Sequence, residues 1–360
     1  MKPTYLTLLA LTLSLSAAGL AAGASSGRVI SWGMNIGGSA DAPRPFVSNW
    51  TGVVSIAGQP LRDIVAVAAG STHALAVRAD GTVEGWGYDY YGQGTGFGTG
   101  SGHATNGFVR IGGRVLSNVI AVAAGDNFSL ALKTDGTVVG WGDNRWGQAA
   151  VPADLKGVTA VAAGKCRGLA LRGDGTVAQW GGLGVGSSAP PARLSNVVAI
   201  AAGGGQFDRN LALKRDGTVV AWGPESDYHD ATPPPGLSNV VAIAVGEHHS
   251  LALRADGTVV GWGINRDGEA TGVPTAGRPW VSSGLVILSG QVLTNVVAVA
   301  AGNEYGMAGI NSRYSLALRK DGTVVAWGCS DCAATQVPAE LTNVTAIAAG
   351  QCFSLAIKKE

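Results

Sequence analysis

The stretch VVAIAVGEHHSLALRADGTVVGWG, Val240 to Gly263, decides the fold of this chain. Its middle part, SLALR from Ser250, alternates apolar and polar residues with a period of two, which is typical of a half-buried strand. The Asp-Gly pair that follows favours a tight hairpin, because Gly accepts positive φ. We therefore expect three consecutive antiparallel strands in this stretch: VVAIAVG, SLALR and TVVGWG.

The same stretch recurs along the chain. A DGTV segment ending in Trp-Gly begins at Asp80, Asp135, Asp174, Asp216, Asp256 and Asp321, and SGRVISWG (Ser26 to Gly33) adds a seventh Trp-Gly strand. The first element, IVAVAAG at Ile64, also occurs seven times. A period of about 40 residues suits one four-stranded propeller blade. The sequence thus predicts an all-β fold, a seven-bladed β-propeller of four-stranded antiparallel blades.

The two ends of the chain carry complementary parts of one repeat. Residues 343–360 contain the first two strands without a Trp-Gly strand, and residues 28–33 supply one. We expect residues 28–33 to complete the blade formed by residues 343–360. This pairing would close the ring and leave no open ends to cap.

The first 24 residues have the pattern of a secretory signal peptide. Lys2 precedes an apolar run from Leu6 to Leu15, small residues follow as far as Ala24, and the run is too short to span a bilayer. We expect a signal peptide at 1–24, cleaved near Ala24, and one propeller domain at 25–360, secreted to the extracellular space or the periplasm. After cleavage we expect a monomer without membrane attachment.

The charge balance argues against nucleic acid as a partner. The 25 Lys and Arg residues nearly balance 24 Asp and Glu residues, for a net charge of +1. A chain with so little net charge is not expected to attract a phosphate backbone electrostatically.

Two segments carry a family resemblance. WGDNRWGQ at Trp141 and SLALRADGTVVGWGINRDG at Ser250 resemble the regulator-of-chromosome-condensation repeat, and the resemblance covers nearly all of the chain after the leader. It implies a seven-bladed propeller. The segment from Trp141 to Gly164 is similar to the repeat of secreted bacterial propellers that inhibit β-lactamases, which implies an exported bacterial protein that binds another protein. Family members bind unrelated partners, so the resemblance specifies fold more than function.

One face of the predicted propeller varies between repeats. In an antiparallel meander, the first turn and the loop after Trp-Gly emerge on one face, and the Asp-Gly turn on the other. The Asp-Gly turns are nearly identical, whereas the opposite loops carry the aromatic and Arg residues of protein-binding surfaces. The candidate partner-binding residues are Tyr88, Tyr90, Tyr91, Arg145, Trp146, Phe207, Tyr228 and Tyr305. The alternative for each is that it covers the end of a blade.

Two repeated positions are assigned to the framework. Every blade has one Trp of Trp-Gly, which suits blade packing; these are Trp32, Trp86, Trp141, Trp180, Trp222, Trp262 and Trp327. The residue before the second strand is also framework, at His73, Phe128, His249, Tyr314 and Phe353.

The sequence contains no motif that predicts a catalytic or metal site. Cys329, Cys332 and Cys352 fall on one face of neighbouring blades, so we expect a disulfide among them, although the sequence does not choose the pair. His248-His249 has no spaced third ligand, and one Cys-x-x-Cys pair is a weak zinc signal. The repeated Asp residues sit at turns, and nucleophile-elbow, zinc-protease and phosphate-loop motifs are absent from the sequence. We expect no metal and no cofactor.

The leading hypothesis is a secreted binding module that is not an enzyme and whose partner is an extracellular protein. Inhibition of an extracellular enzyme is one version. The alternative is a carbohydrate-binding or carbohydrate-active propeller, based on aromatic residues that could stack on sugars and on the acidic Glu225, Asp227 and Asp230. Guanine-nucleotide exchange, suggested by the family name, is less favoured because of the export signal.

Overall fold

A computed structural model describes residues 26–35, 47–98, 100, 104–182, 189–203, 209–223, 232–277, 280–302, 312–329 and 331–360. The elements of these residues are all β-strands. Within this part of the chain, no helix has the length and apolar character needed to cross a membrane. The expected signal peptide, residues 1–24, lies outside the described residues.

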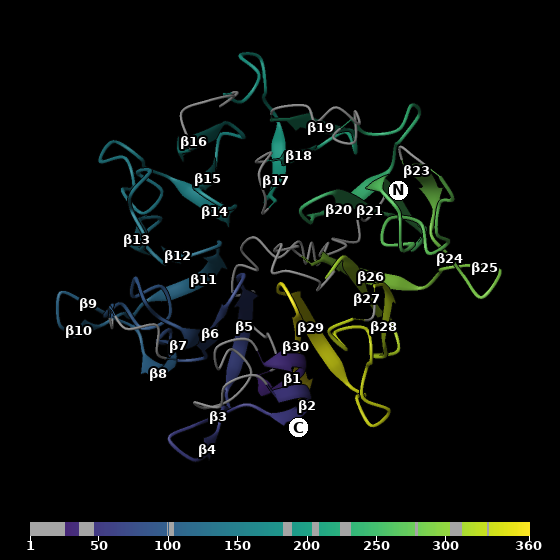
Figure 1. Ribbon diagram of the computed structural model, residues 1–360. Coiled ribbons are helices and arrows are strands. Elements are labelled where there is room, and N and C mark those ends of the chain that lie inside the picture. The colour runs from purple at the N-terminus through teal and green to yellow at the C-terminus, as the bar shows by residue number, and fades with distance from the viewer. Residues whose placement is uncertain are drawn as a thin grey trace, which may run out of the picture.

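The described strands form seven antiparallel meanders arranged around a central axis (Figure 1). Ala-rich inner strands line the axis: β5 (Ile64–Ala69), β11 (Val119–Ala124), β14 (Val158–Ala163), β17 (Val197–Ala202), β20 (Val240–Val245), β26 (Val296–Ala301) and β29 (Val344–Ala349). Each inner strand contacts the next, and β29 contacts β5. The inner strands therefore form a closed ring.

The second and third strands of each blade follow the predicted pattern. The second strands are β6 (His73–Arg78), β12 (Phe128–Lys133), β15 (Arg167–Arg172), β18 (Asn210–Lys214), β21 (His249–Arg254), β27 (Tyr314–Arg319) and β30 (Phe353–Lys359). The third strands carry the Trp-Gly pairs: β7 (Val83–Tyr88), β13 (Val138–Gly142), β16 (Val177–Gly181), β19 (Val219–Trp222), β22 (Val259–Ile264), β28 (Val324–Gly328) and β1 (Gly27–Asn35).

A fourth strand is present in three blades. β2 (Val47–Val53), β8 (Ala104–Phe108) and β23 (Val281–Leu285) pair with β1, β7 and β22. A small hairpin follows each of them: β3 (Ser55–Ile56) with β4 (Gln59–Pro60), β9 (Arg110–Ile111) with β10 (Arg114–Val115), and β24 (Ile287–Leu288) with β25 (Gln291–Val292).

In the other four blades the described residues contain no fourth strand. After β13 every residue from 143 to 157 is described and none is in a strand, so the prediction of a four-stranded blade was wrong there. Proline is the physical reason, because it lacks the N–H that a strand ladder requires. In VPADLKG the chain turns at Pro152, whose carbonyl accepts a hydrogen bond from Leu155 N (3.1 Å), and Leu155 is buried against the blade. A proline-initiated turn thus replaces the outer strand.

The Asp-Gly turns share one conformation. In the first, Gly81 has φ of 78° and Asp80 Oδ1 accepts hydrogen bonds from Thr82 N (2.9 Å) and Thr82 Oγ1 (2.6 Å). Gly81 O then accepts a hydrogen bond from Val119 N, the first residue of the next inner strand. These turns and the entries to the inner strands therefore lie together on one face.

The two ends of the chain meet in one blade, which we call the seam blade (β29, β30, β1 and β2). β1 pairs with β30 from Gly27 opposite Lys359 to Gly33 opposite Phe353, and in Figure 1 purple β1 lies beside β30 and yellow β29. The predicted pairing of residues 28–33 with the C-terminal strands is present. At Gly33 the strands approach so closely that a Cβ would lie 2.5 Å from Cys352 O.

The core lies between blades as well as within them. One cluster, for example, packs Leu211 and Leu213 of β18 against Val240, Ala252 and Trp262 of the following blade. Small Ala side chains allow the inner strands to crowd the axis, where they line a narrow channel of about 80 Å³. Burial between neighbours fixes the positions of the loops above them.

Candidate partner-binding face

The first turns and the loops after Trp-Gly share one face, as the sequence predicted. The two are joined by hydrogen bonds in several blades: Tyr88 N donates to Thr72 O (2.9 Å), Asp143 N to Asn127 O (2.8 Å) and Ile264 N to His248 O (2.8 Å). We call this side the loop face and the segment after each Trp-Gly pair the Trp-Gly loop.

An Asp or Asn side chain shapes three of the Trp-Gly loops from within. Asp89, fully buried, accepts hydrogen bonds from Gly94 N (2.6 Å) and Thr95 N (3.2 Å) through Oδ1. Asn265 Oδ1 accepts from Ala270 N and Thr271 N, both at 2.9 Å, and Asn144 Oδ1 accepts from Ala149 N (3.1 Å). These side chains satisfy backbone donors of the loop, as such residues do in turns. The loops are therefore fixed without regular secondary structure.

In three loops a Gln or Glu ties the loop to the next blade; it lies four residues after Asp89, Asn144 or Asn265. Gln93 Oε1 accepts a hydrogen bond from Tyr91 N (3.0 Å), while Gln93 O accepts from Trp141 Nε1 (2.9 Å) and Ser129 Oγ (2.8 Å). Gln148 repeats the arrangement, with Trp146 N on its side chain (2.9 Å). The Trp of the following blade thus anchors the loops that contain Gln93, Gln148 and Glu269.

Three tyrosines form a cluster at the end of β7. The rings of Tyr88 and Tyr90 are stacked, with centroids 6.4 Å apart and planes 9° apart. Tyr90 and Tyr91 meet edge to face at 4.7 Å and 75°. Such arrangements suit the charge distribution of aromatic rings. Tyr90 remains 40% exposed and is the most accessible ring of the cluster.

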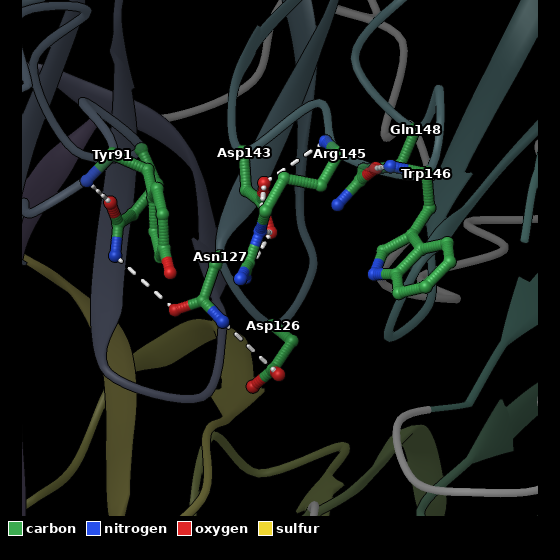
Figure 2. A network of polar contacts seen from close by, with 8 residues as sticks. Tyr91, Asp126, Asn127, Asp143, Arg145, Trp146 and Gln148 are labelled. Atoms are coloured by element: carbon green, nitrogen blue, oxygen red, sulfur yellow. Dashed lines mark hydrogen bonds and ion pairs between the residues drawn. The ribbon is translucent and has the colours of Figure 1, made fainter. Parts of the chain in front are cut away.

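Arg145 extends this cluster across the boundary between two blades. Its guanidinium carbon lies 4.7 Å from the centroid of the Tyr91 ring, a cation–π geometry. Its Nη2 also lies 2.8 Å from Asp143 Oδ2, and its Nε lies 2.9 Å from Asp143 Oδ1, as Figure 2 shows. This bidentate pair holds the guanidinium over the ring.

The environment of Asp143 keeps its carboxylate charged. Burial by itself raises the pKa of the Asp143 carboxyl, but hydrogen bonds from Arg145 and the charge of Arg145 outweigh that effect, so its pKa is lowered. The same contact raises the pKa of Arg145. The pair therefore stays ionised at neutral pH, while the Arg145 side chain remains 61% exposed.

Trp146 is the most exposed Trp among the described residues, at 47%. Its backbone N–H is held by Gln148, and its indole extends away from Arg145 (Figure 2). A large apolar side chain on a fixed backbone loses little conformational entropy when a partner covers it.

Comparison with known families accounts for this recurring geometry. The family described as Regulator of chromosome condensation (RCC1) repeat matches residues 64–93, 119–148 and 240–269. These three segments match the RCC1 repeat. The three matched segments each run from the inner strand to the Gln or Glu that anchors the Trp-Gly loop, at Gln93, Gln148 and Glu269.

Solved structures share the propeller fold of these RCC1 repeats. Prp20p from Saccharomyces cerevisiae is 19% identical with a TM-score of 0.67, covering 94% of this chain and 93% of that one. Human WBSCR16 is 18% identical with a TM-score of 0.65, covering 92% of this chain and all of that one, 100%. At these identities the likeness shows the fold alone.

A curated human relative has a much longer sequence. The probable E3 ubiquitin-protein ligase HERC6 of Homo sapiens is 34% identical over 123 residues, which are 34% of this chain and 12% of that protein. The chain thus matches only a small part of that relative's length.

The structure brings five of the eight candidate residues onto adjacent RCC1 repeats. Tyr88, Tyr90 and Tyr91 come from one Trp-Gly loop and its preceding strand, and Arg145 and Trp146 from the next. The other three candidates, Phe207, Tyr228 and Tyr305, lie outside the described residues. The sequence analysis missed Asp89, Asn265 and Gln93, although an Asp or Asn shortly after Trp-Gly and a Gln or Glu at the end of the matched segment were visible signals.

The framework positions are buried. The seven Trp of the Trp-Gly pairs are at most 8% exposed, and the five residues before the second strands, His73, Phe128, His249, Tyr314 and Phe353, are at most 1% exposed. Since Ser129 Oγ donates to Gln93 O, His73 Nε2–H donates to Ser129 Oγ (2.8 Å). Burial lowers the pKa of both His73 and His249 to about 3. Among the described residues, no group of His, Cys, Asp and Glu side chains is arranged to hold a metal ion.

None of the four cysteines is in a disulfide in this structure, and the expected disulfide among Cys329, Cys332 and Cys352 stays a prediction. Cys332 and Cys352 nevertheless hydrogen-bond through their side chains across a blade boundary.

Proposed function

We propose that this protein is a secreted, non-catalytic binding module whose loop face binds another protein. One observation carries the proposal. Two exposed rings, Tyr90 and Trp146, lie on adjacent anchored loops, and the Arg145–Tyr91 contact joins those loops. Tyr, Trp and Arg are the residue types that contribute most to protein interfaces. Because the loops are fixed by internal hydrogen bonds, binding requires little additional ordering.

The charges on this face favour a protein over a polyanion. Arg145 is already paired with Asp143, and Asp126 and Asn127 lie beside it (Figure 2). The chain as a whole carries a net charge of only +1. A surface of aromatic rings and locally balanced charges suits recognition by shape and apolar contact.

Proteins with the same fold support a protein partner. The Prp20p structure is described together with binding to Gsp1p and histones, and another structure has Kap60 bound to yeast RCC1 (Prp20). For this chain the leader pattern of residues 1–24 favours an extracellular partner, and slowing of an extracellular enzyme by occlusion of its active site is the concrete form we propose.

A glycan is the second candidate. Tyr90 and Trp146 are exposed enough to stack on sugar rings. The acidic residues on which a glycan-directed activity would depend, Glu225, Asp227 and Asp230, lie outside the described residues. Guanine-nucleotide exchange, the third reading, has no support beyond the shared fold.

The proposal is tested by affinity capture from the native extracellular milieu. The bait is the mature chain, residues 25–360, beside a Tyr90→Ala, Trp146→Ala double variant and a Phe108→Ala control. Phe108 is 43% exposed, comparable to the two tested rings, but it pairs with Glu84 at the end of β7 away from the loop face. A protein captured by the parent and the control but lost with the double variant supports the proposal. Capture of glycan alone, or equal capture by all three baits, contradicts it.

A further inference from the structure

Three of the four cysteines gather where the last complete blade meets the seam blade. Cys329 and Cys332 belong to the Trp-Gly loop that follows β28, and Cys352 lies in the turn between β29 and β30. All three are buried, Cys332 and Cys352 at 1% exposure. The fourth, Cys166, lies in a different blade.

Cys332 and Cys352 are the two thiols in direct contact. The hydrogen bond to Cys352 and burial raise the pKa of Cys332, whereas the same hydrogen bond, with a contribution from Ser312, lowers the pKa of Cys352. Both side chains pack in one apolar cluster with Trp32 and Ala334. Cys329 differs, because burial and the charges of Asp331 and Asp267 raise the pKa of its thiol to about 11.

The segments that carry these two thiols are held against each other by independent contacts. Ala334 O accepts hydrogen bonds from Trp32 Nε1 (2.9 Å) and Ser354 Oγ (3.1 Å), which come from β1 and β30 of the seam blade. The position of a Cβ on Gly33 would be 2.5 Å from Cys352 O and 3.3 Å from Ala334 Cα. Backbone on both sides of the thiol pair is therefore fixed by the folded ring.

We propose that Cys332 and Cys352 form a disulfide by exchange with a small-molecule disulfide, and that this bond locks the seam blade to its neighbour. The Cys352 thiolate attacks one sulfur of the small disulfide and releases one thiolate, giving a mixed disulfide. Cys332 then loses its proton and attacks the Cys352 sulfur, which releases the second small thiol. The protein loses two hydrogens, and the small disulfide is reduced to two thiols.

The bond would link two blades at the point where the ring closes. It joins residues 20 positions apart in sequence and restricts the unfolded chain, so the oxidised ring is expected to melt at a higher temperature than the reduced ring. Because both sulfurs are buried, exchange proceeds as the turn around Cys352 opens or while the chain folds. Persistence of the bond suits an oxidising compartment.

The test uses the purified chain, reduced and then equilibrated with oxidised and reduced glutathione. We expect a mass loss of about 2 Da, as two thiol hydrogens are removed. Denaturing thiol titration should fall from four thiols to two. A non-reducing peptide map should join the peptide with Cys332 to the peptide with Cys352, and the thermal midpoint should rise.

Two variants make the assignment specific. Cys166→Ser should leave both the bridge and the stabilisation intact, whereas Cys352→Ser should abolish both. The non-reducing peptide map of the parent protein tests the proposal even if the Cys352→Ser variant folds poorly. Four titratable thiols after equilibration, or a bridge between Cys329 and Cys332, would overturn it.

Discussion

Arg145 lies over the ring of Tyr91 with its guanidinium carbon 4.7 Å from the ring centroid, although the two residues belong to neighbouring RCC1 repeats. Asp143 holds the guanidinium there through a bidentate pair. The contact joins two variable loops into one surface. Each of these two loops is anchored by the Trp of the blade that follows it, Trp141 or Trp180.

Asp143→Asn should release this surface. The substitution removes the charge that holds Arg145, and the nearly buried side chain then loses a charge-assisted pair, which costs on the order of 1 kcal/mol of folding free energy. The loss in binding free energy for the partner should exceed the loss in the free energy of unfolding. Urea unfolding and titration calorimetry measure the two effects. Asp154→Asn, at an exposed position in the turn that begins at Pro152, is the control; equal effects from both variants would contradict the account.

The exposed rings should matter for binding and little for folding. Tyr90→Ala and Trp146→Ala remove side chains that are 40% and 47% exposed, so each should change the free energy of unfolding by only about 0.5 kcal/mol or less. Unfolding by urea gives the measurement, with Phe108→Ala beside it. A loss several times larger for either variant would show that the ring covers the blade and is not a free binding residue.

Ring closure should control the stability of the whole propeller. Deleting residues 28–33 removes the strand that pairs with β30, together with fully buried Trp32, and should destabilise every blade. Trp32→Ala alone should cost roughly 3–5 kcal/mol. Thermal melting followed by circular dichroism tests both changes. If the deletion variant melts like the parent, β1 is not the closing strand.

Buried histidines should make the propeller sensitive to mild acid. Burial lowers the pKa of His73 and His249 in the folded state to about 3, below the ordinary value of 6.5. The unfolded chain therefore takes up protons first, and stability that is present above pH 6.5 is lost as the pH falls toward 3. The slope in that window is about 1.4 kcal/mol per pH unit for each histidine.

The repeats supply a matched variant for this prediction. Phe128 and Phe353 occupy the same position in other blades and are fully buried. His73→Phe combined with His249→Phe should therefore fold and should flatten the loss of stability between neutral pH and mild acid. Urea midpoints measured across the pH range give the comparison, and an unchanged slope in the double variant would rule the histidines out.

The sequence was most informative where every repeat obeys the same constraint. The Asp-Gly turn, repeated six times, and the Trp-Gly and Ala-rich inner strands, each repeated seven times, predicted the strand order, the two faces and the pairing of β1 with β30. The fourth strand was less predictable. Segments such as VPADLKG fill the outer edge with a turn at Pro152, since burial of Leu155 does not require strand pairing.

The sequence predicted which types of residue form the site, but it did not predict which of those residues are in contact. Tyr91 and Arg145 were chosen because they vary on one face, yet their contact depends on Asp143, Gln93 and the Trp of the next blade. Such contacts cross a blade boundary, and the spacing of residues along one repeat does not encode them. The same reasoning applies to Cys332 and Cys352, whose contact also crosses the boundary between two blades.

The most direct test of the central claim is a hydrogen-exchange footprint of the captured partner on the propeller. Amide exchange is compared for the free and the bound protein at the loops 88–98 and 143–149, and at the Asp-Gly turns on the opposite face. The account predicts added protection at the two loops and none at the turns. Protection confined to the Asp-Gly turns or to the outer strands would contradict the claim that the loop face binds the partner.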